Sequence, residues 1–280
     1  MINKPLVLKV GGSFFDDNNA QQDFFAALSM LLAKGRRIVV VHGGGNQVQN
    51  QLQALGFASS KHKGLRVTPD EHMPTVTGVL AGTLNKSLVI AAQQQSIAAV
   101  GLSLADGDMC ICSQIDPLLG AVGMPHPQNA TLLNLLIDAH YLPVISSIGR
   151  DNNGNLFNVN ADQAATCVAQ LLDAELYLLS DVPGVLNEHK VLVDSLSTEL
   201  AKAMIDAGVI TDGMIVKVEA AQAAANELKR PVVVGSWAAM SHIVTTKLNH
   251  VGTLITPKFA PNNTPDDGSA ANSIDNKTHV

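Results

Sequence analysis

The sequence has few cysteines, no long apolar run and no excess of positive charge, and each absence excludes a class of protein. Its 280 residues include three cysteines, with Cys110 and Cys112 spaced i, i+2 and Cys167 alone. A disulfide framework needs a denser, even set, and a structural zinc site needs four ligands in paired spacing. We therefore expect reduced, packed cysteines and no metal site built by the protein.

Charge and apolar patterning exclude further classes. The formal net charge of −6 argues against a general binder of nucleic acid or of anionic membranes. No run approaches the roughly 20 apolar residues of a membrane helix, and the short stretch between Lys4 and Lys9 cannot hold a secretory signal. We expect a cytoplasmic protein without nucleic-acid or membrane partners.

The familiar catalytic and nucleotide-binding motifs are also missing. There is no G-x-x-x-x-G-K-[ST], since segment 82–87 lacks the second glycine, and no G-x-G-x-x-G follows a strand. No persuasive Ser-His-Asp or Cys-His pattern occurs either. A nucleotide, if one is bound, must be held by another architecture.

What is present indicates a compact α/β chain, with 46% hydrophobic and 15% charged residues and a mean hydropathy of +0.19. We predict one domain over 1–260, with two lobes of one sheet at about 1–172 and 173–257, and a disordered polar tail over 261–280. The predicted strands are 5–10, 37–42, 97–104, 142–147, 175–180, 232–235 and 252–256. The predicted helices are 20–34, 46–54, 70–95, 130–139, 161–172, 195–207 and 213–228, with hairpins over 109–124 and 150–160.

Two of the predicted strands end in glycines, and the first contains a lysine. Strand 5–10 carries Lys9 and runs into Gly11-Gly12, and strand 37–42 runs into Gly43-Gly44-Gly45. A lysine in a buried strand is costly unless it faces an anion, and glycines let backbone N–H groups approach one. Because ligands of open α/β sheets bind at the carboxyl ends of the strands, we predict a phosphate or carboxylate site there. A simple strand-to-helix turn is the alternative for the second glycine run.

Two further polar sites stand at predicted helix starts. Lys217 lies in the first turn of helix 213–228, where it opposes the helix dipole unless a phosphate binds with it; the alternative is a solvated lysine. Asn158, Asn160 and Asp162 alternate at a strand end and so share one face. They favour a polar ligand, although Asp162 could serve simply as an N-cap.

Three more positions complete the candidates. Arg66 sits in a basic segment, 61–69, that resembles a lid hairpin, and arginine suits bidentate carboxylate binding; a solvated loop is equally compatible. Asp181 opens a turn, 181–186, which is either functional or an ordinary Pro-Gly turn. For His42 we expect a packed core histidine.

Together these segments resemble the amino acid kinase family over about residues 4–256, most closely its members that act on N-acetyl-L-glutamate. The segments are Lys9-Val10-Gly11-Gly12, His42-Gly43-Gly44-Gly45, Gly64-Leu65-Arg66-Val67-Thr68, Asn158-Val159-Asn160-Ala161-Asp162, Ser180-Asp181-Val182-Pro183-Gly184-Val185 and Gly213-Met214-Ile215-Val216-Lys217.

The resemblance implies a three-layer α-β-α sandwich with a mostly parallel central sheet, the carbamate kinase-like fold. It implies phosphorylation of the side-chain carboxylate of N-acetyl-L-glutamate by ATP, with Mg²⁺ carried by the nucleotide. Lys9 and Lys217 would neutralise the moving charge, and Asp162 would hold both ammonium groups. The first lobe would bind the acceptor through Gly44, Gly45, Arg66, Asn158 and Asn160. The phosphoryl group and the nucleotide would contact Gly11, Gly12, Asp181, Val182, Pro183, Gly184, Val185, Leu186, Val209, Ile210 and Thr211.

The alternatives are another member of the family, acting on carbamate, glutamate, aspartate or UMP, and a non-catalytic metabolite sensor with the same fold. The apolar helical stretch 73–92 is a plausible homodimer surface, although it could simply pack on the sheet. The few residues before the first strand leave no room for the extra amino-terminal helix of hexameric, arginine-inhibited relatives. We therefore expect a dimer that arginine does not inhibit. The tail is an addition to the pattern of the family.

Overall fold

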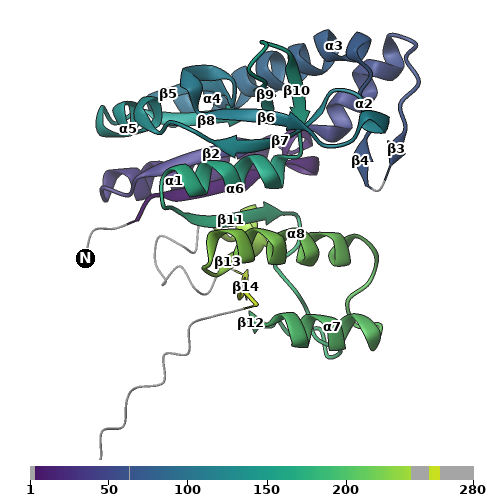
Figure 1. Ribbon diagram of the computed structural model, residues 1–280. Helices are drawn as coiled ribbons and strands as arrows, with labels where there is room; N and C mark the ends of the chain where they lie inside the picture. The colour runs from purple at the N-terminus through teal and green to yellow at the C-terminus, as the bar shows by residue number, and fades with distance from the viewer. Residues whose placement is uncertain (1–3, 63, 241–251, 259–280) are drawn as a thin grey trace, which may run out of the picture.

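A central sheet of eight strands organises the chain in the computed structural model, which describes residues 4–62, 64–240 and 252–258 (Figure 1). The strand order is β12-β14-β13-β11-β1-β2-β8-β5, and all neighbours are parallel except β13 and β14. The strands are β1 (Leu6–Val10), β2 (Ile38–His42), β5 (Ala99–Ser103), β8 (Leu142–Ser146), β11 (Glu175–Ser180), β12 (Ser195–Leu196), β13 (Val232–Ser236) and β14 (Gly252–Ile255).

Helices cover both faces of this sheet, because the side chains of each strand alternate between two apolar clusters. On β1, Leu6 and Leu8 pack with the cluster that contains α1 and α4, whereas Val7 packs with the cluster that contains α6 and α8. Figure 1 shows α6 and α8 lying along the strands. The predicted three-layer sandwich with a mostly parallel sheet is therefore confirmed. The helices are α1 (Asn18–Ala33), α2 (Gly45–Ala54), α4 (Asn85–Gln94), α5 (Thr131–Asp138), α6 (Ala161–Leu171), α7 (Thr198–Asp206) and α8 (Asp212–Leu228).

The predicted helix 70–95 is a succession of helical segments: η2 (Asp70–His72), α3 (Met73–Thr77), the π-helical η3 (Gly78–Leu84) and α4. By length and composition alone, Asp70–Gln94 could cross a membrane, which the sequence analysis did not expect. Its side chains Leu80, Leu84 and Leu88 are nevertheless buried against the sheet and its neighbours. One face of the helix is thus part of the domain core.

Both predicted hairpins are confirmed, and they join in a second sheet of order β6-β7-β10-β9. Its strands are β6 (Cys110–Gln114), β7 (Val122–Pro127), β9 (Ile148–Arg150) and β10 (Leu156–Val159). The predicted lid is a small hairpin of β3 (Lys61–His62) and β4 (Leu65–Arg66). The remaining short helices are η1 (Gly12–Asp16), η4 (Asp106–Asp108), η5 (Pro117–Leu119) and η6 (Trp237–Ala239).

The stretch 195–207 is not helical from its start: β12 forms first, and α7 begins only after Ser197, whose hydroxyl accepts from the Leu200 N–H. A serine with extended backbone is a strong helix start, which decides the boundary. The three cysteines are free and buried, as expected. The predicted tail 261–280 lies outside the described residues.

Candidate active site

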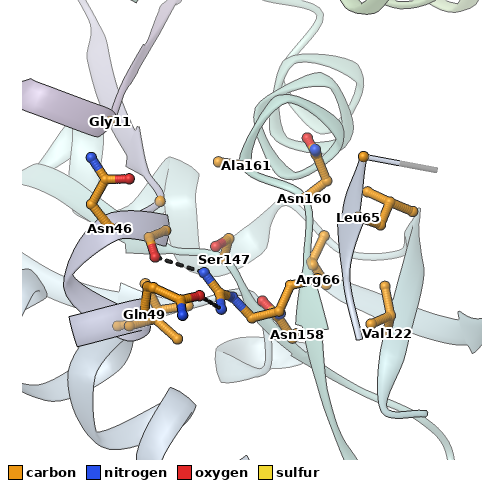
Figure 2. Close-up of a pocket in the computed structure, with 18 of the residues that line it drawn as sticks. Gly11, Asn46, Gln49, Leu65, Arg66, Val122, Ser147, Asn158, Asn160 and Ala161 are labelled. Atoms are coloured by element: carbon orange, nitrogen blue, oxygen red, sulfur yellow. Dashed lines mark hydrogen bonds between the residues drawn. The ribbon is translucent and has the colours of Figure 1, made fainter. Parts of the chain in front are cut away.

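A cleft of about 320 Å³ opens where β1 and β2 end, and it brings together one lysine, the glycines and the acceptor-binding residues that the sequence singled out (Figure 2). Parallel neighbours end at the same edge of a sheet, so the glycines that follow β1 and β2 meet there. From the predicted set, the cleft is lined by Lys9, Gly11, Gly12, Gly44, Gly45, Arg66, Asn158 and Asn160.

Lys9 and Asp162 form an ion pair at the side of this cleft. Lys9 follows Val7 on the same face of β1, the face that α6 covers, so its ammonium group meets the first turn of α6. Lys9 Nζ lies 2.8 Å from Asp162 Oδ1, with 18% of the lysine side chain and 26% of the aspartate side chain exposed. A partly buried cation is thereby held by a carboxylate while it stays within reach of a ligand.

Asn160, not Asp162, caps α6. Its Oδ1 accepts from the Asp162 N–H at 2.8 Å and from the Gln163 N–H at 3.4 Å. The capping role considered for Asp162 is therefore wrong, because an asparagine two residues earlier already fills it. This leaves the Asp162 carboxylate free to pair with Lys9.

The glycine run after β2 forms the start of α2. The Gly43 N–H donates to Val10 O at 3.3 Å, which joins the two strand ends. Gly44 occupies the N-cap position without a side-chain cap, so N–H groups of the first turn of α2 are available at the cleft. A Cβ at Gly44 would lie 2.1 Å from Leu84 Cδ1, so any other residue here would force the Leu84 side chain to move. The run is thus more than a simple turn.

Arg66 reaches from the β3–β4 hairpin into the cleft (Figure 2). Its Nη2 donates to Gly45 O at 2.8 Å, and its Nη1 donates to Gln49 Oε1 at 2.5 Å and to Ser59 Oγ. Partial burial lowers the pKa of Arg66, because desolvation disfavours the charged form. An anion in the cleft would compensate that cost.

Asn158 projects from β10 and is oriented by the lid hairpin. Its Nδ2 donates to Thr68 Oγ1 at 3.0 Å, and the Thr68 hydroxyl donates to Arg66 O at 3.1 Å. Thr68 is fully buried. One hydroxyl therefore links the Asn158 amide to the backbone of Arg66, and both residues line the same cleft.

Lys217 lies in α8 near the end of β11. Its Nζ is 3.2 Å from Ser180 Oγ and 3.3 Å from Asp181 Oδ1. A small cavity of about 30 Å³ is lined by both lysines and Asp162. The prediction that Asp162 holds both ammonium groups is met for Lys9, whereas the ammonium group of Lys217 contacts Ser180 and Asp181.

Of the predicted nucleotide segments, 181–186 follows the end of β11 and 209–211 precedes the start of α8. Both therefore lie near the first turns of α8, which carry Lys217. Val185 and Ile210 are buried in the core, so their side chains cannot touch a ligand. The backbone of Gly184 adopts φ 142°, and a Cβ there would lie 2.8 Å from Leu192 Cδ1 and Thr253 Oγ1. Any contact from these buried positions to a nucleotide must therefore come from the backbone.

His42 is a packed histidine, as expected, but it is part of a buried polar group that the sequence did not reveal. Its Nδ1 lies 2.9 Å from Gly43 O, and its Nε2 lies 3.1 Å from Asn85 Nδ2. Burial lowers its pKa to about 4. Asn85 lies in an apolar helical pattern and is 43 residues from His42 in the chain. No local feature of the sequence therefore predicts that these two side chains meet.

Other cleft residues were also missed, notably Ser147 and Gln49. Ser147 lies just after β8 and is 2% exposed, and Gln49 is the partner of Arg66 described above. Neither belongs to a motif; only the topology brings them to the cleft. Within the described parts of the chain, no group of three His, Cys, Asp or Glu side chains could hold a metal ion.

Comparison with known proteins agrees with this geometry. Residues 4–236 match the sequence profile of the amino acid kinase family. The chain is 46% identical over 255 residues to the acetylglutamate kinase of Colwellia psychrerythraea, covering 91% of this chain and 97% of that protein. It is 49% identical over 234 residues to the acetylglutamate kinase of Vibrio campbellii, covering 83% and 89%. The crystal structure of smu.665 from Streptococcus mutans UA159 matches with a TM-score of 0.74 and 28% identity, covering 91% of this chain and 99% of that one. The chain therefore belongs to the amino acid kinase family.

Proposed function

We propose that the chain transfers the γ-phosphoryl group of ATP to the side-chain carboxylate of N-acetyl-L-glutamate, the second step of arginine biosynthesis. The observation that carries this proposal is one cleft in which a lysine and two glycine loops face an arginine and an asparagine. The first set suits a phosphoryl group, and the second suits an amino acid with its amine blocked. The two acetylglutamate kinases described above support the same acceptor.

The chemistry needs charge neutralisation and alignment more than proton transfer. The acceptor carboxylate has a reference pKa near ~4.3 and is already ionised at neutral pH, so no general base is required. Lys9, held by Asp162, approaches from β1, and Lys217 approaches from α8. Their charges reduce the repulsion between two anions and stabilise the transition state.

The acceptor is held at its other end. Arg66 binds the α-carboxylate, and Asn158 binds the acetamido group, with Asn160 beside it in the same wall. The N–H groups of Gly11, Gly12, Gly44 and Gly45 line the path of the phosphoryl group. Mg²⁺ is bound by the nucleotide phosphates and enters with them, since the carboxylates of Asp162 and Asp181 each form an ion pair with a lysine.

A coupled assay of ADP release tests this function. ADP release should require N-acetyl-L-glutamate and should stay at background with glutamate, aspartate, carbamate or UMP, and hydroxylamine should trap the acyl phosphate as a hydroxamate. Preference for another acceptor in the panel would assign a different member of the family. Binding of N-acetyl-L-glutamate without any ADP release would favour a sensor.

A homodimer through helix Asp70–Gln94 is part of the proposal. This helix is apolar enough in composition to cross a membrane, yet Pro74, Thr83 and Ile90 are exposed on it. Light scattering should give the mass of a dimer, and Thr83→Arg should give a monomer. Leu200→Arg, on the exposed surface of α7, should leave the dimer intact. A wild-type monomer, or a dimer insensitive to Thr83→Arg, would contradict this interface.

A further inference from the structure

We infer that His42 and Asn85 are positioning residues for phosphoryl transfer, because together they fix the peptide plane that presents the Gly44 N–H to the cleft. The inference rests on the function proposed above. Neither side chain lines the cleft: His42 is fully buried and Asn85 is 1% exposed. They act through the glycine loop that lies between them and the ligand.

The peptide geometry gives the first step. Gly43 O and the Gly44 N–H belong to one planar trans peptide, so they point in opposite directions. Gly43 O lies 2.9 Å from His42 Nδ1, in the buried interior. The Gly44 N–H therefore points away from His42, on the side of the loop that faces the cleft.

The loop needs such a lock because it consists of glycines. Gly43 and Gly44 have no Cβ to restrict rotation, so their shared peptide can turn over at little steric cost. Turned over, it would present a carbonyl oxygen to the phosphoryl group and repel it. The hydrogen bond from His42 opposes this rotation directly.

The tautomer of His42 is set by Asn85. A carbonyl oxygen only accepts, so Nδ1 carries the proton; an amide nitrogen only donates, so Nε2 accepts from Asn85 Nδ2 at 3.1 Å. This is a neutral imidazole, which agrees with its lowered pKa of about 4. Without Asn85, the proton could move to Nε2 and the bond to Gly43 would be lost.

Asn85 is itself rigidly placed. Its Nδ2 also lies 2.8 Å from Val144 O on β8 and 3.2 Å from Leu102 O on β5, so its two hydrogens are shared among three acceptors on the successive strands β2, β8 and β5. A Cβ at Gly101 would lie 1.9 Å from Asn85 Oδ1, which shows how closely the amide fills its site. Its neighbour Leu84 fills the space beside Gly44 at the end of the π-helical segment. The junction between η3 and α4 thus supports the glycine loop in two ways. Asn85 does so through its hydrogen bond to His42, and Leu84 does so by packing beside Gly44.

The test compares four variants in steady-state kinetics. His42→Leu should lower kcat about tenfold or more, because small displacements of a catalytic group are costly, while both KM values stay within about twofold. His42→Asn should restore most of the rate, since its amide can donate from near the position of Nδ1. Asn85→Ala should resemble His42→Leu, and the double variant should be no slower than His42→Leu. The control Ser146→Ala, which removes another buried hydrogen bond to Leu102 O, should be normal.

Hydrogen–deuterium exchange of the substrate-free protein gives a readout independent of activity. The peptide that contains Gly43–Gly45 should exchange faster in His42→Leu and Asn85→Ala than in the wild type or Ser146→Ala. Unchanged kcat in these variants, additive losses in the double variant, or unchanged exchange would overturn the inference. If His42→Leu does not fold, Asn85→Ala and His42→Asn decide by the same criteria. If the wild type fails to phosphorylate N-acetyl-L-glutamate, the proposed function falls, whereas the exchange comparison still decides this inference.

Discussion

The proposed acceptor side and the proposed nucleotide side of the molecule differ in how completely side chains already line each site. On the acceptor side, the cleft of about 320 Å³ is lined by polar side chains that hold one another, such as Arg66 on Gln49 and Asn158 on Thr68. On the nucleotide side, the cavity at Lys217 holds about 30 Å³, roughly the space of one water molecule. The motif positions Val185 and Ile210 are core residues.

The difference separates two modes of recognition. A small acceptor with a carboxylate and an amide needs directional side chains, which the β3–β4 hairpin and β10 supply. The segments assigned to the nucleotide offer mainly backbone groups at turns, with Lys217 as a point charge. Substitutions of side chains should therefore change acceptor binding strongly and ATP binding weakly, and four measurements test this contrast.

The largest effect is expected where the two sides meet. Lys9→Ala and Lys217→Ala should each lower kcat by about 10²–10³-fold, or about 2.7–4 kcal/mol, with smaller changes in either KM, because both charges act on the moving phosphoryl group. Steady-state kinetics with both substrates varied would check this. Lys4→Ala, which removes an exposed lysine paired with Asp173, is the control. Near-normal turnover in either variant would remove that lysine from the reaction.

The next effect concerns the support of the acceptor side at low pH. The pKa of His42 is lowered from 6.5 to about 4 by burial, so between these values the unfolded chain binds a proton that the folded chain does not. The neutral ring contributes its full stabilisation above pH 6.5, and this contribution is lost as the pH falls through 4. The free energy of unfolding should fall by about 3 kcal/mol in total, at ~1.36 kcal/mol per pH unit. The groups that contact the ring are Asn85, Phe15 and Gly43 O, with Lys86 beyond Asn85.

Denaturant unfolding of the wild type and His42→Asn between pH 7.5 and pH 4 would check this. The difference in unfolding free energy between the two proteins should shrink as the pH falls, because only the wild type carries this proton linkage. A constant difference across that range would show that the burial of His42 does not govern acid stability.

A smaller effect should fall on the acceptor side alone. Arg66→Lys should raise KM for N-acetyl-L-glutamate by about 10–100-fold, since a hydrogen bond to a charged group contributes about 1.5–3 kcal/mol and lysine lacks the planar fork. KM for ATP should stay within about twofold. The matched control is Arg150→Lys, whose guanidinium contacts Asp108 and Asp151 O outside the cleft. Equal changes in both KM values would erase the contrast between the two sides.

The smallest effect should come from the partner of Lys217. Asp181→Asn should change turnover and KM for ATP less than about fivefold, because this pair is exposed, with 36% and 61% of the two side chains accessible, and such pairs contribute about 0–1 kcal/mol. Asp162→Asn is the comparison, and its loss of turnover should exceed tenfold. If Asp181→Asn proved the more damaging of the two, Asp181 and not Asp162 would organise the lysines.

Local pattern predicted much of this molecule. Apolar runs predicted seven of the eight strands of the central sheet, all except β12, and the glycines after β1 and β2 indicated an anion site at their ends. The wrong predictions also concern local features of the chain, namely where two helices begin. The start of α7 was missed because Ser197 caps it after a short edge strand, and the capping role of Asn160 was hidden by the more obvious Asp162.

The sequence by itself determined the apolar runs that form strands buried on both faces, the glycines at the strand ends, and the order of motifs that marks the family. Only the tertiary structure decided which side chains meet across long stretches of chain: Asn158 with Thr68, Arg66 with Gln49 and Gly45, and His42 with Asn85. The physical reason is that backbone conformation depends on neighbours in sequence, whereas a salt bridge or a buried hydrogen bond depends on where the topology of the sheet places distant segments.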